Sequence, residues 1–313
     1  MEIIQDDLQQ KGFFWVEALK PQWGEVPSQN SLEGIWGQLR LRLVAGSPLF
    51  VGSGEIGVDG EGRTYFQFAR CYDRYIIPGS SLKGAVRGLA ELLSPSCMAV
   101  VDDRSYRKRC FATKQRPPLS LCPACGIFGA PGYYGRVGIE DAPVDKGFTR
   151  LIEQIDHRTE ARRFGPSPDR ERAFSYRKLY SRDPAQQTWY REKERLEVLR
   201  GVTAEVLLYF RQLREWELGL LTLSLGIAPE HEFAFKLGGG KNRGMGLVKL
   251  QFLEGAYSPG RGWFLGHWKQ VTREILKSWL EAYRVKARSW NSGLWEKIKQ
   301  VVNKLQEVYE EKK

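Results

Sequence analysis

The segment LGGGKNRGMGLV, residues 237–248, joins two short apolar runs, residues 232–237 and 246–253, that have the pattern of strands. Five glycines fall within nine residues, so the backbone can adopt positive φ angles and approach a ligand closely. Lys241 and Arg243 add positive charge where exposed N–H groups can donate to an anion. A nucleotide-binding P-loop requires Ser or Thr after its lysine, and neither is present. The segment is therefore either a phosphate-binding loop of another kind or a plain glycine-rich turn.

Outward from this loop, the chain contains two strand–helix–strand series. The first begins at residue 38, where Leu39, Leu41 and Leu43 alternate with polar residues as in a half-buried strand. A helix that Ser80 or Ser81 can cap comes next, and residues 135–142 form a second strand. The other series is a strand at 203–210, a helix at 215–225 and the strands beside the glycine loop. This order predicts an α+β fold with a ferredoxin-like sheet covered by helices on one face.

The pattern changes at both ends of this core and inside it. Residues 1–37 are rich in aromatic residues, proline and glycine. They are predicted to be an extension, outside the core at 38–254, that packs against another segment rather than forming a free domain. Residues 155–200 are polar, basic and weakly periodic, which predicts an insertion that reaches out from the core. Residues 262–313 form a C-terminal extension of two amphipathic helices broken near 291–293. Their apolar faces are expected to cover either this domain or a neighbouring subunit.

The composition favours a nucleic-acid or acidic partner. The 313 residues carry a formal charge of +11, and residues 158–200 hold twelve basic and seven acidic side chains. Ten Trp and thirteen Tyr offer faces on which bases can stack. The N-terminus lacks the pattern of a secretory signal and no apolar run of about 18 residues occurs, so we expect a cytoplasmic protein without a membrane segment.

Four cysteines lie in one segment at about 95–126, namely Cys97, Cys110, Cys122 and Cys125. Disulfides are disfavoured in the cytoplasm, and the two-residue spacing of the last pair lets both sulfurs reach one tetrahedral ion. We predict a structural zinc site whose four thiolates close the coordination shell. A redox pair and unliganded cysteines are the alternatives. Cys71 lies in a run that resembles a strand and is predicted to be in the core.

Four motifs in this order resemble the RAMP superfamily of CRISPR-associated proteins. They are IPGSSLKGAVR (77–87), CPACGIFG (122–129), GRVGIEDA (135–142) and the glycine loop. The resemblance covers about residues 38–254 and is closest to backbone subunits of type III effector complexes. It implies a ferredoxin-like, RNA-recognition-type core in an antiviral ribonucleoprotein, bound to CRISPR guide RNA, target RNA and other RAMP and effector-complex subunits. The insertion at 155–200 would be the thumb that kinks guide and target.

The resemblance also implies which residues bind RNA. Those matched to guide-phosphate contacts are Ser81, Lys83 and Arg87 on the helix, and Gly239, Gly240, Lys241 and Arg243 in the same groove. His157 and Arg158 match the entry to the thumb, which is the poorest match of all. A helix N-terminus and a glycine loop are both anion sites, so the residues by themselves support this groove.

Some subunits of this kind also cut target RNA with a loop aspartate and a divalent metal, Mg²⁺ or Mn²⁺. Asp59 is the best counterpart here, and Glu55 and Glu61 are weaker ones. The family context is altered by an insertion at about 64–75, and an ordinary turn is the other interpretation of Asp59. Cleavage by this chain is therefore left open at this stage.

Two other functions compete with a guide-binding subunit. One is a stand-alone endoribonuclease that processes precursor guide RNA. The three histidines, His157, His231 and His267, do not sit beside a Tyr or Lys in an evident acid–base arrangement, which argues against it. The other is a zinc-containing RNA-binding protein unrelated to CRISPR, and the four ordered motifs argue against that.

Overall fold

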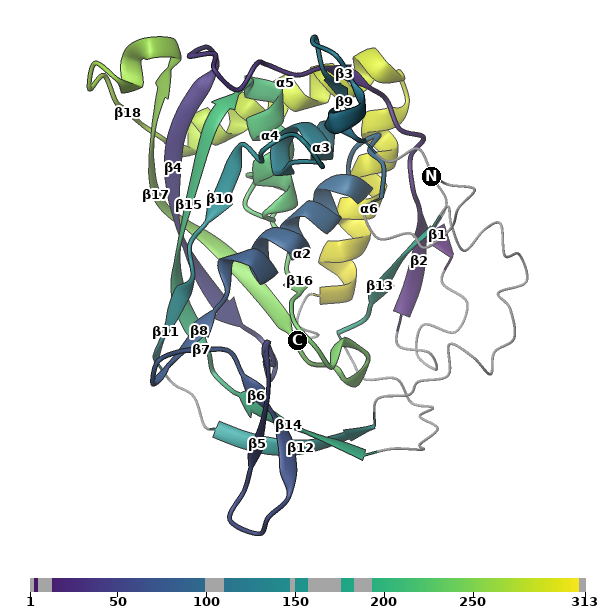
Figure 1. Cartoon of the computed structure of the whole chain (residues 1–313). Coiled ribbons are helices and arrows are strands. Elements are labelled where there is room, and N and C mark those ends of the chain that lie inside the picture. The colour runs from purple at the N-terminus through teal and green to yellow at the C-terminus, as the bar shows by residue number, and fades with distance from the viewer. Residues whose placement is uncertain are drawn as a thin grey trace.

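A curled antiparallel sheet forms the centre of the computed structural model, which describes residues 3–4, 13–98, 110–146, 150–156, 176–182 and 193–309 (Figure 1). Its strands in spatial order are β16 (Phe235–Lys236), β17 (Leu247–Pro259), β4 (Ile35–Ala45), β15 (Thr203–Leu213), β11 (Ala142–Lys146), β8 (Arg74–Ile77) and β7 (Arg70–Cys71). Two further strands, β10 (Val137–Ile139) and β18 (Lys269–Gln270), pair with β15 and β17. The predicted α+β class is confirmed.

The central strand β4 follows from its alternating sequence. Leu39, Leu41 and Leu43 are fully buried on one face, while Arg40 and Arg42 are exposed on the other. The strand pairs antiparallel with β15 on one side and with β17 on the other. It begins at residue 35, three residues before the alternation starts at 38, because the ladder with β17 continues to that point. Alternation in the sequence thus identified the strand and its buried face.

Helix α2 (Gly79–Leu92) lies across the buried face of the sheet with α4 (Glu215–Ser224), and the short α3 (Pro123–Phe128) packs beside it (Figure 1). The predicted serine cap is wrong: Pro78 is the N-cap, and Ser80 and Ser81 fall within the first turn without a side-chain cap. Instead the carboxylate of Asp141 accepts a hydrogen bond of 2.8 Å from the Gly79 backbone N–H. A free N–H group at the start of α2 is therefore satisfied by Asp141, which lies 62 positions away between β10 and β11, and not by a neighbouring serine.

The C-terminal segment forms two helices, α5 (Arg273–Trp290) and α6 (Leu294–Tyr309), with the predicted break between them. Trp279 and Tyr283 are buried against the domain's own core. A Cβ at Gly219 of α4 would lie 2.0 Å from the carbonyl oxygen of Trp279, so only glycine allows α4 and α5 to approach this closely. The sequence left open whether these apolar helix faces cover this domain or a neighbouring subunit. In the structure they pack on the core of this domain.

Three smaller sheets lie outside the central one. One is formed by β12 (Arg150–Asp156), β14 (Lys193–Leu199), β6 (Thr64–Phe68) and β5 (Gly52–Val58). Another is formed by β1 (Ile3–Ile4), β2 (Phe13–Glu17) and β13 (Tyr176–Tyr180). The third joins β3 (Gly24–Glu25) to β9 (Ser120–Leu121). The second sheet pairs the N-terminal extension with a strand of the 155–200 insertion, a contact that neither sequence pattern indicated.

The strand β14 is held to the core by Glu197, a fully buried carboxylate. It accepts hydrogen bonds from the Phe68 backbone N–H at 2.9 Å, the Arg70 guanidinium at 2.6 Å and the Tyr75 hydroxyl at 2.8 Å. Cys71, next to Arg70, is exposed, so its predicted place in the core is wrong. The short hairpin of β7 and β8 at the sheet's edge leaves its turn open to solvent.

Candidate functional site

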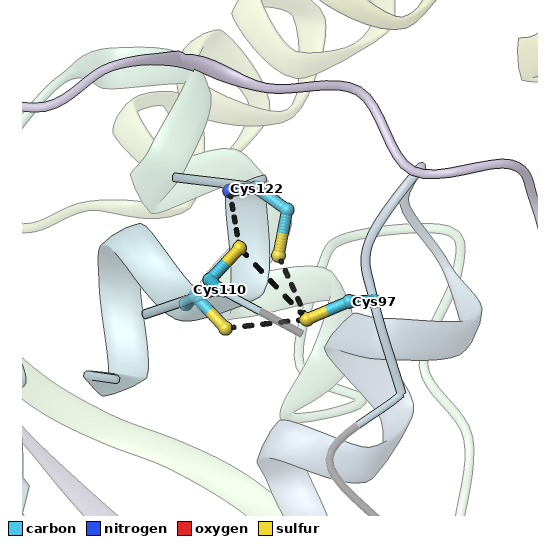
Figure 2. Close-up of side chains that lie close together, drawn as sticks. Cys97, Cys110 and Cys122 are labelled. Atoms are coloured by element: carbon cyan, nitrogen blue, oxygen red, sulfur yellow. Dashed lines mark hydrogen bonds between the residues drawn. The ribbon is translucent and has the colours of Figure 1, made fainter. Parts of the chain in front are cut away.

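The four predicted metal ligands lie together. Figure 2 shows Cys97, Cys110 and Cys122 pointing toward one another, and Cys125 completes the group. The sulfur of Cys97 lies 3.9 Å from that of Cys110, 3.6 Å from that of Cys122 and 3.5 Å from that of Cys125. All four ligand atoms are within 4.8 Å of one another, and all four residues are buried.

These distances fit a metal better than disulfides. A zinc ion bound at about 2.3 Å to four sulfurs in tetrahedral geometry would set them about 3.8 Å apart. A disulfide needs sulfurs at about 2.05 Å, and all five cysteines of the chain are free. Four buried cysteines in this arrangement could hold a metal such as zinc, which would stiffen the segment without leaving a coordination position for catalysis.

The cluster is assembled from three places in the chain. Cys97 follows the end of α2, Cys110 precedes the 3₁₀ turn at Ala112–Lys114, and Cys122 and Cys125 bracket the start of α3. Pro123 occupies the first turn of α3, where its missing N–H is not needed. The Cys122 backbone N–H donates to the Cys110 sulfur at 3.3 Å. The long spacings in sequence are thus closed by packing against α2.

A buried ion pair that the sequence did not indicate lies beneath the cluster. Arg136 is 0% and Glu217 3% exposed, and both carboxylate oxygens accept from the guanidinium. Arg136 also donates to the carbonyl of Gly126 at 2.8 Å and to that of Gln212 at 2.6 Å. The pair therefore joins α3, which holds Gly126, to the start of α4. Its one sequence signal was an arginine in the GRVGIEDA motif without an assigned role.

The glycine loop has the backbone that its composition predicted. Gly240 and Gly244 take left-handed conformations with φ of 66° and 77° around a 3₁₀ turn at Lys241–Arg243. The buried Lys236 ammonium holds the loop by donating to the carbonyls of Gly244 at 2.9 Å and Met245 at 3.0 Å. These hydrogen bonds fix the conformation of the loop backbone on its buried side. Lys236 was not singled out from the sequence.

A cavity of about 210 Å³ lies between the glycine loop and α2. Its walls come from five elements: α2, the glycine loop, β16, β13 and α6. Its lining is Ser81, Gly84, Ala85, Gly88, Leu89, Arg177, Lys178, Leu179, Tyr180, Phe235, Lys236, Leu237, Gly238, Lys241, Leu305 and Tyr309. The structure thus brings together two of the predicted RNA-binding residues, Ser81 and Lys241, and adds the basic strand β13.

The cavity is positively charged. Burial, and then the charge of Arg177, lower the pKa of Lys241, whose ammonium has no carboxylate partner within the described residues. Burial also lowers the pKa of Lys178, whose ammonium lies 3.6 Å from the ring centre of Phe13. Charged ammonium groups held close together in a partly desolvated cavity favour an anionic ligand.

Lys83 and Arg87 lie on a different side of α2 from Ser81. Burial, and then the neighbouring Arg87, lower the pKa of Lys83, whose ammonium lies against Gly135. The Arg87 guanidinium contacts the Cys125 sulfur at 3.3 Å and the Gly129 carbonyl at 3.0 Å. Neither residue lines the cavity. They are two and six positions from Ser81, so on a helix of 3.6 residues per turn they face other sides.

The predicted catalytic residue Asp59 lies at the turn between β5 and β6. These two strands belong to the sheet β12-β14-β6-β5, and their hairpin extends away from the central sheet (Figure 1). Its carboxylate accepts from the backbone N–H groups of Glu61 at 3.0 Å and Arg63 at 2.9 Å, and from the side chains of Arg63 and Arg195. The hydrogen bond from Arg195 is the main reason that its pKa falls well below the usual range. Glu61 pairs with Arg63 at 2.5 Å, and Glu55 is exposed on β5.

Two predicted RNA contacts, His157 and Arg158, lie outside the described residues. Among the helices of the described ranges, none is long and apolar enough to cross a membrane.

Comparison with known protein families identifies the superfamily of this chain. The model of the RAMP superfamily matches residues 42–249, more than half of the 313 residues. The chain belongs to the RAMP superfamily. RAMP proteins bind CRISPR RNA and work in multisubunit complexes, so membership indicates a CRISPR-associated RNA-binding role. A search of curated proteins found no match to this RAMP chain. The match includes the glycine loop, the cysteine cluster and α2.

Proposed function

We propose that this RAMP protein is a CRISPR RNA-binding backbone subunit of a type III antiviral ribonucleoprotein effector. The observation that carries the proposal is the cavity between α2 and the glycine loop, where Lys241 has no acidic partner in the described part of the chain. Guide phosphates would lie against Ser81, Lys241, Arg243 and the backbone of Gly239 and Gly240. Lys83, which lies on another side of α2 with its ammonium against Gly135, would contact the guide outside the cavity. Other RAMP and effector-complex subunits, and target RNA, would be its partners.

The proposed core is ferredoxin-like. Strand β4, helix α2 and β10–β11 would form one half, and β15, α4 and β17 the other. The spatial order β17-β4-β15-β11 with antiparallel neighbours supports this, because the last strand of one half lies beside the first strand of the other. In this scheme residues 1–37 are an extension, 38–254 the RAMP domain with insertions at about 95–126 and 155–200, and 262–313 a second extension.

Phosphate binding in this groove would be largely electrostatic. Each phosphate neutralised on a single strand contributes about 0.7 to the slope of log K against log salt. The loop backbone would position the strand, and the cations would supply affinity without reading sequence. A subunit that holds many different guides needs this kind of contact.

The test measures binding of guide RNA at several salt concentrations for Lys241→Ala/Arg243→Ala. The salt slope should fall by about 1.4, twice the value for one contact. A matched control, Lys277→Ala/Lys297→Ala, removes the same charge from exposed positions on α5 and α6 and should leave the slope unchanged. Equal slopes for the first variant and the wild type would refute the groove.

Target-RNA cleavage through Asp59 stays a prediction, and so does the use of Mg²⁺ or Mn²⁺. The two arginines that neutralise its carboxylate also fit a purely structural turn. Asp59→Asn keeps an oxygen for the two backbone N–H groups and removes the charge. If Asp59 acts in cleavage, the assembled complex with Asp59→Asn loses one cleavage product while binding target RNA normally. Unchanged cleavage would leave Asp59 a turn residue, and cleavage of precursor guide RNA by the isolated chain would favour the endoribonuclease alternative.

A further inference from the structure

Arg87 uses all three guanidinium nitrogens inside the protein. Its Nε donates to Glu91 at 2.9 Å, one Nη to the Gly129 carbonyl at 3.0 Å and the other Nη to the Cys125 sulfur at 3.3 Å. The side chain is 24% exposed. A guanidinium in this position is directed at the cysteine cluster, although its sequence motif matches a phosphate contact.

A metal-bound cysteine cluster would need a hydrogen-bond donor of this kind. Four thiolates around one divalent ion carry a net charge of about −2, and a buried charge needs hydrogen-bond donors or cations around it. Donors next to metal ligands hold the ligands in place and tune the affinity of the metal, commonly by 10- to 100-fold. Arg87 supplies a cation and a directed N–H to Cys125 from the rigid middle of α2.

The same arginine is connected to the cavity through Glu91. This carboxylate is 2% exposed and also accepts a hydrogen bond of 2.9 Å from Arg177 on β13. The Arg177 guanidinium packs so closely on α2 that a Cβ at Gly88 would lie 2.2 Å from one of its nitrogens. Cys125, Arg87, Glu91 and Arg177 therefore form a continuous series of polar contacts from the cluster, along α2, to the cavity wall beside Lys241.

We infer that Arg87 is a hydrogen-bond donor to the metal-bound Cys125 thiolate, and that through Glu91 and Arg177 it couples metal occupancy to the affinity of the cavity for RNA. The second half of this inference rests on the proposed RNA groove, and the first half does not. Loss of the metal removes the charge that orients Arg87, frees Glu91 and lets β13 shift relative to Lys241.

The first experiment separates a donor to the cluster from a phosphate contact. Arg87→Gln should lower the affinity for zinc 10- to 100-fold, measured by competition with a chromogenic chelator, and leave the salt slope of RNA binding unchanged at saturating zinc. Lys83→Gln, which removes a cation one turn earlier on α2, should keep wild-type zinc affinity. Wild-type zinc affinity in Arg87→Gln together with a slope lowered by about 0.7 would overturn the inference.

Arg87→Lys keeps the charge but loses the planar set of donors, so it covers the case in which Arg87→Gln does not fold. It should also bind zinc more weakly than the wild type, and equal affinity would count against the inference.

The second experiment tests the coupling. Chelation of zinc should weaken guide-RNA binding by the wild type, whereas Arg177→Gln should bind zinc normally and show a smaller RNA response to chelation. An RNA response equal to that of the wild type would refute the coupling. If Lys241→Ala/Arg243→Ala leaves the salt slope of RNA binding unchanged, the proposed RNA groove is wrong. The zinc affinity of Arg87→Gln still decides whether Arg87 is a donor to the metal-bound Cys125.

Discussion

The buried pair of Arg136 and Glu217 is the contact whose loss should cost the most stability. Glu217→Gln keeps the shape of the side chain but removes its charge and replaces one acceptor oxygen by a donor. Arg136 would then be left with its charge uncompensated at 0% exposure. The substitution also weakens the hydrogen bond of 2.8 Å from the Arg214 backbone N–H, which helps begin α4.

The size of the effect follows from these contacts. Removing one partner of a buried ion pair costs about 3 to 5 kcal/mol, because the other charge stays buried without compensation. Hydrogen bonds to charged groups contribute about 1.5 to 3 kcal/mol each, and at least one is reversed here, because the amide nitrogen replaces one of the two acceptor oxygens. At roughly 2 °C per kcal/mol for a chain longer than 250 residues, the melting temperature should fall by about 6 to 10 °C.

Urea unfolding and thermal melts of the zinc-loaded protein measure the change. Glu215→Gln is the control, because Glu215 is exposed on the same first turn of α4 and should cost about 0.5 kcal/mol. Arg136→Met/Glu217→Gln should be less destabilised than the sum of its single variants, since it leaves no isolated buried charge. A Glu217→Gln variant within 1 kcal/mol of Glu215→Gln would show that the pair contributes little.

Three further outcomes follow from the structure. With zinc bound, a thiol reagent should react rapidly with one cysteine, the exposed Cys71, and with all five after chelation and unfolding; more than one rapid thiol would contradict a closed cluster. Gly238→Ala should lower the free energy of unfolding more than Gly54→Ala does. Both glycines have positive φ, but only at Gly238 would the Cβ lie 2.0 Å from a carbonyl oxygen, that of Phe50. Equal losses in urea unfolding would argue against this contact. Burial lowers the pKa of His231, so below pH 6.5 the unfolded chain takes up a proton that the folded chain resists, and stability should fall with pH down to the lowered pKa. His231→Gln should remove part of the loss of melting temperature between about pH 7.5 and 5.5, and an unchanged loss would count against it.

Several of the main strands, helices and turns could be predicted from residue patterns alone. The alternation at Leu39, Leu41 and Leu43, the spacing in the C-terminal helices and the glycines around Lys241 each depend on neighbours within a few residues. Backbone period and backbone freedom are local properties, so they can be read along the chain. The spacing of Cys122 and Cys125 similarly identified one half of the cluster.

Tertiary structure decided where the polar side chains point. Asp141 caps α2 in place of Ser80 or Ser81, and Arg136 meets Glu217 from 81 positions away. Arg87 carries a motif that matches a phosphate contact, yet its guanidinium contacts Cys125. A charged side chain takes the partner that best offsets its desolvation, and that partner is set by how distant elements pack. The sequence alone therefore determined the main strands and helices of the core and the inventory of cations and thiols, whereas packing determined which side chains meet and how the strands of the insertion at 155–200 pair.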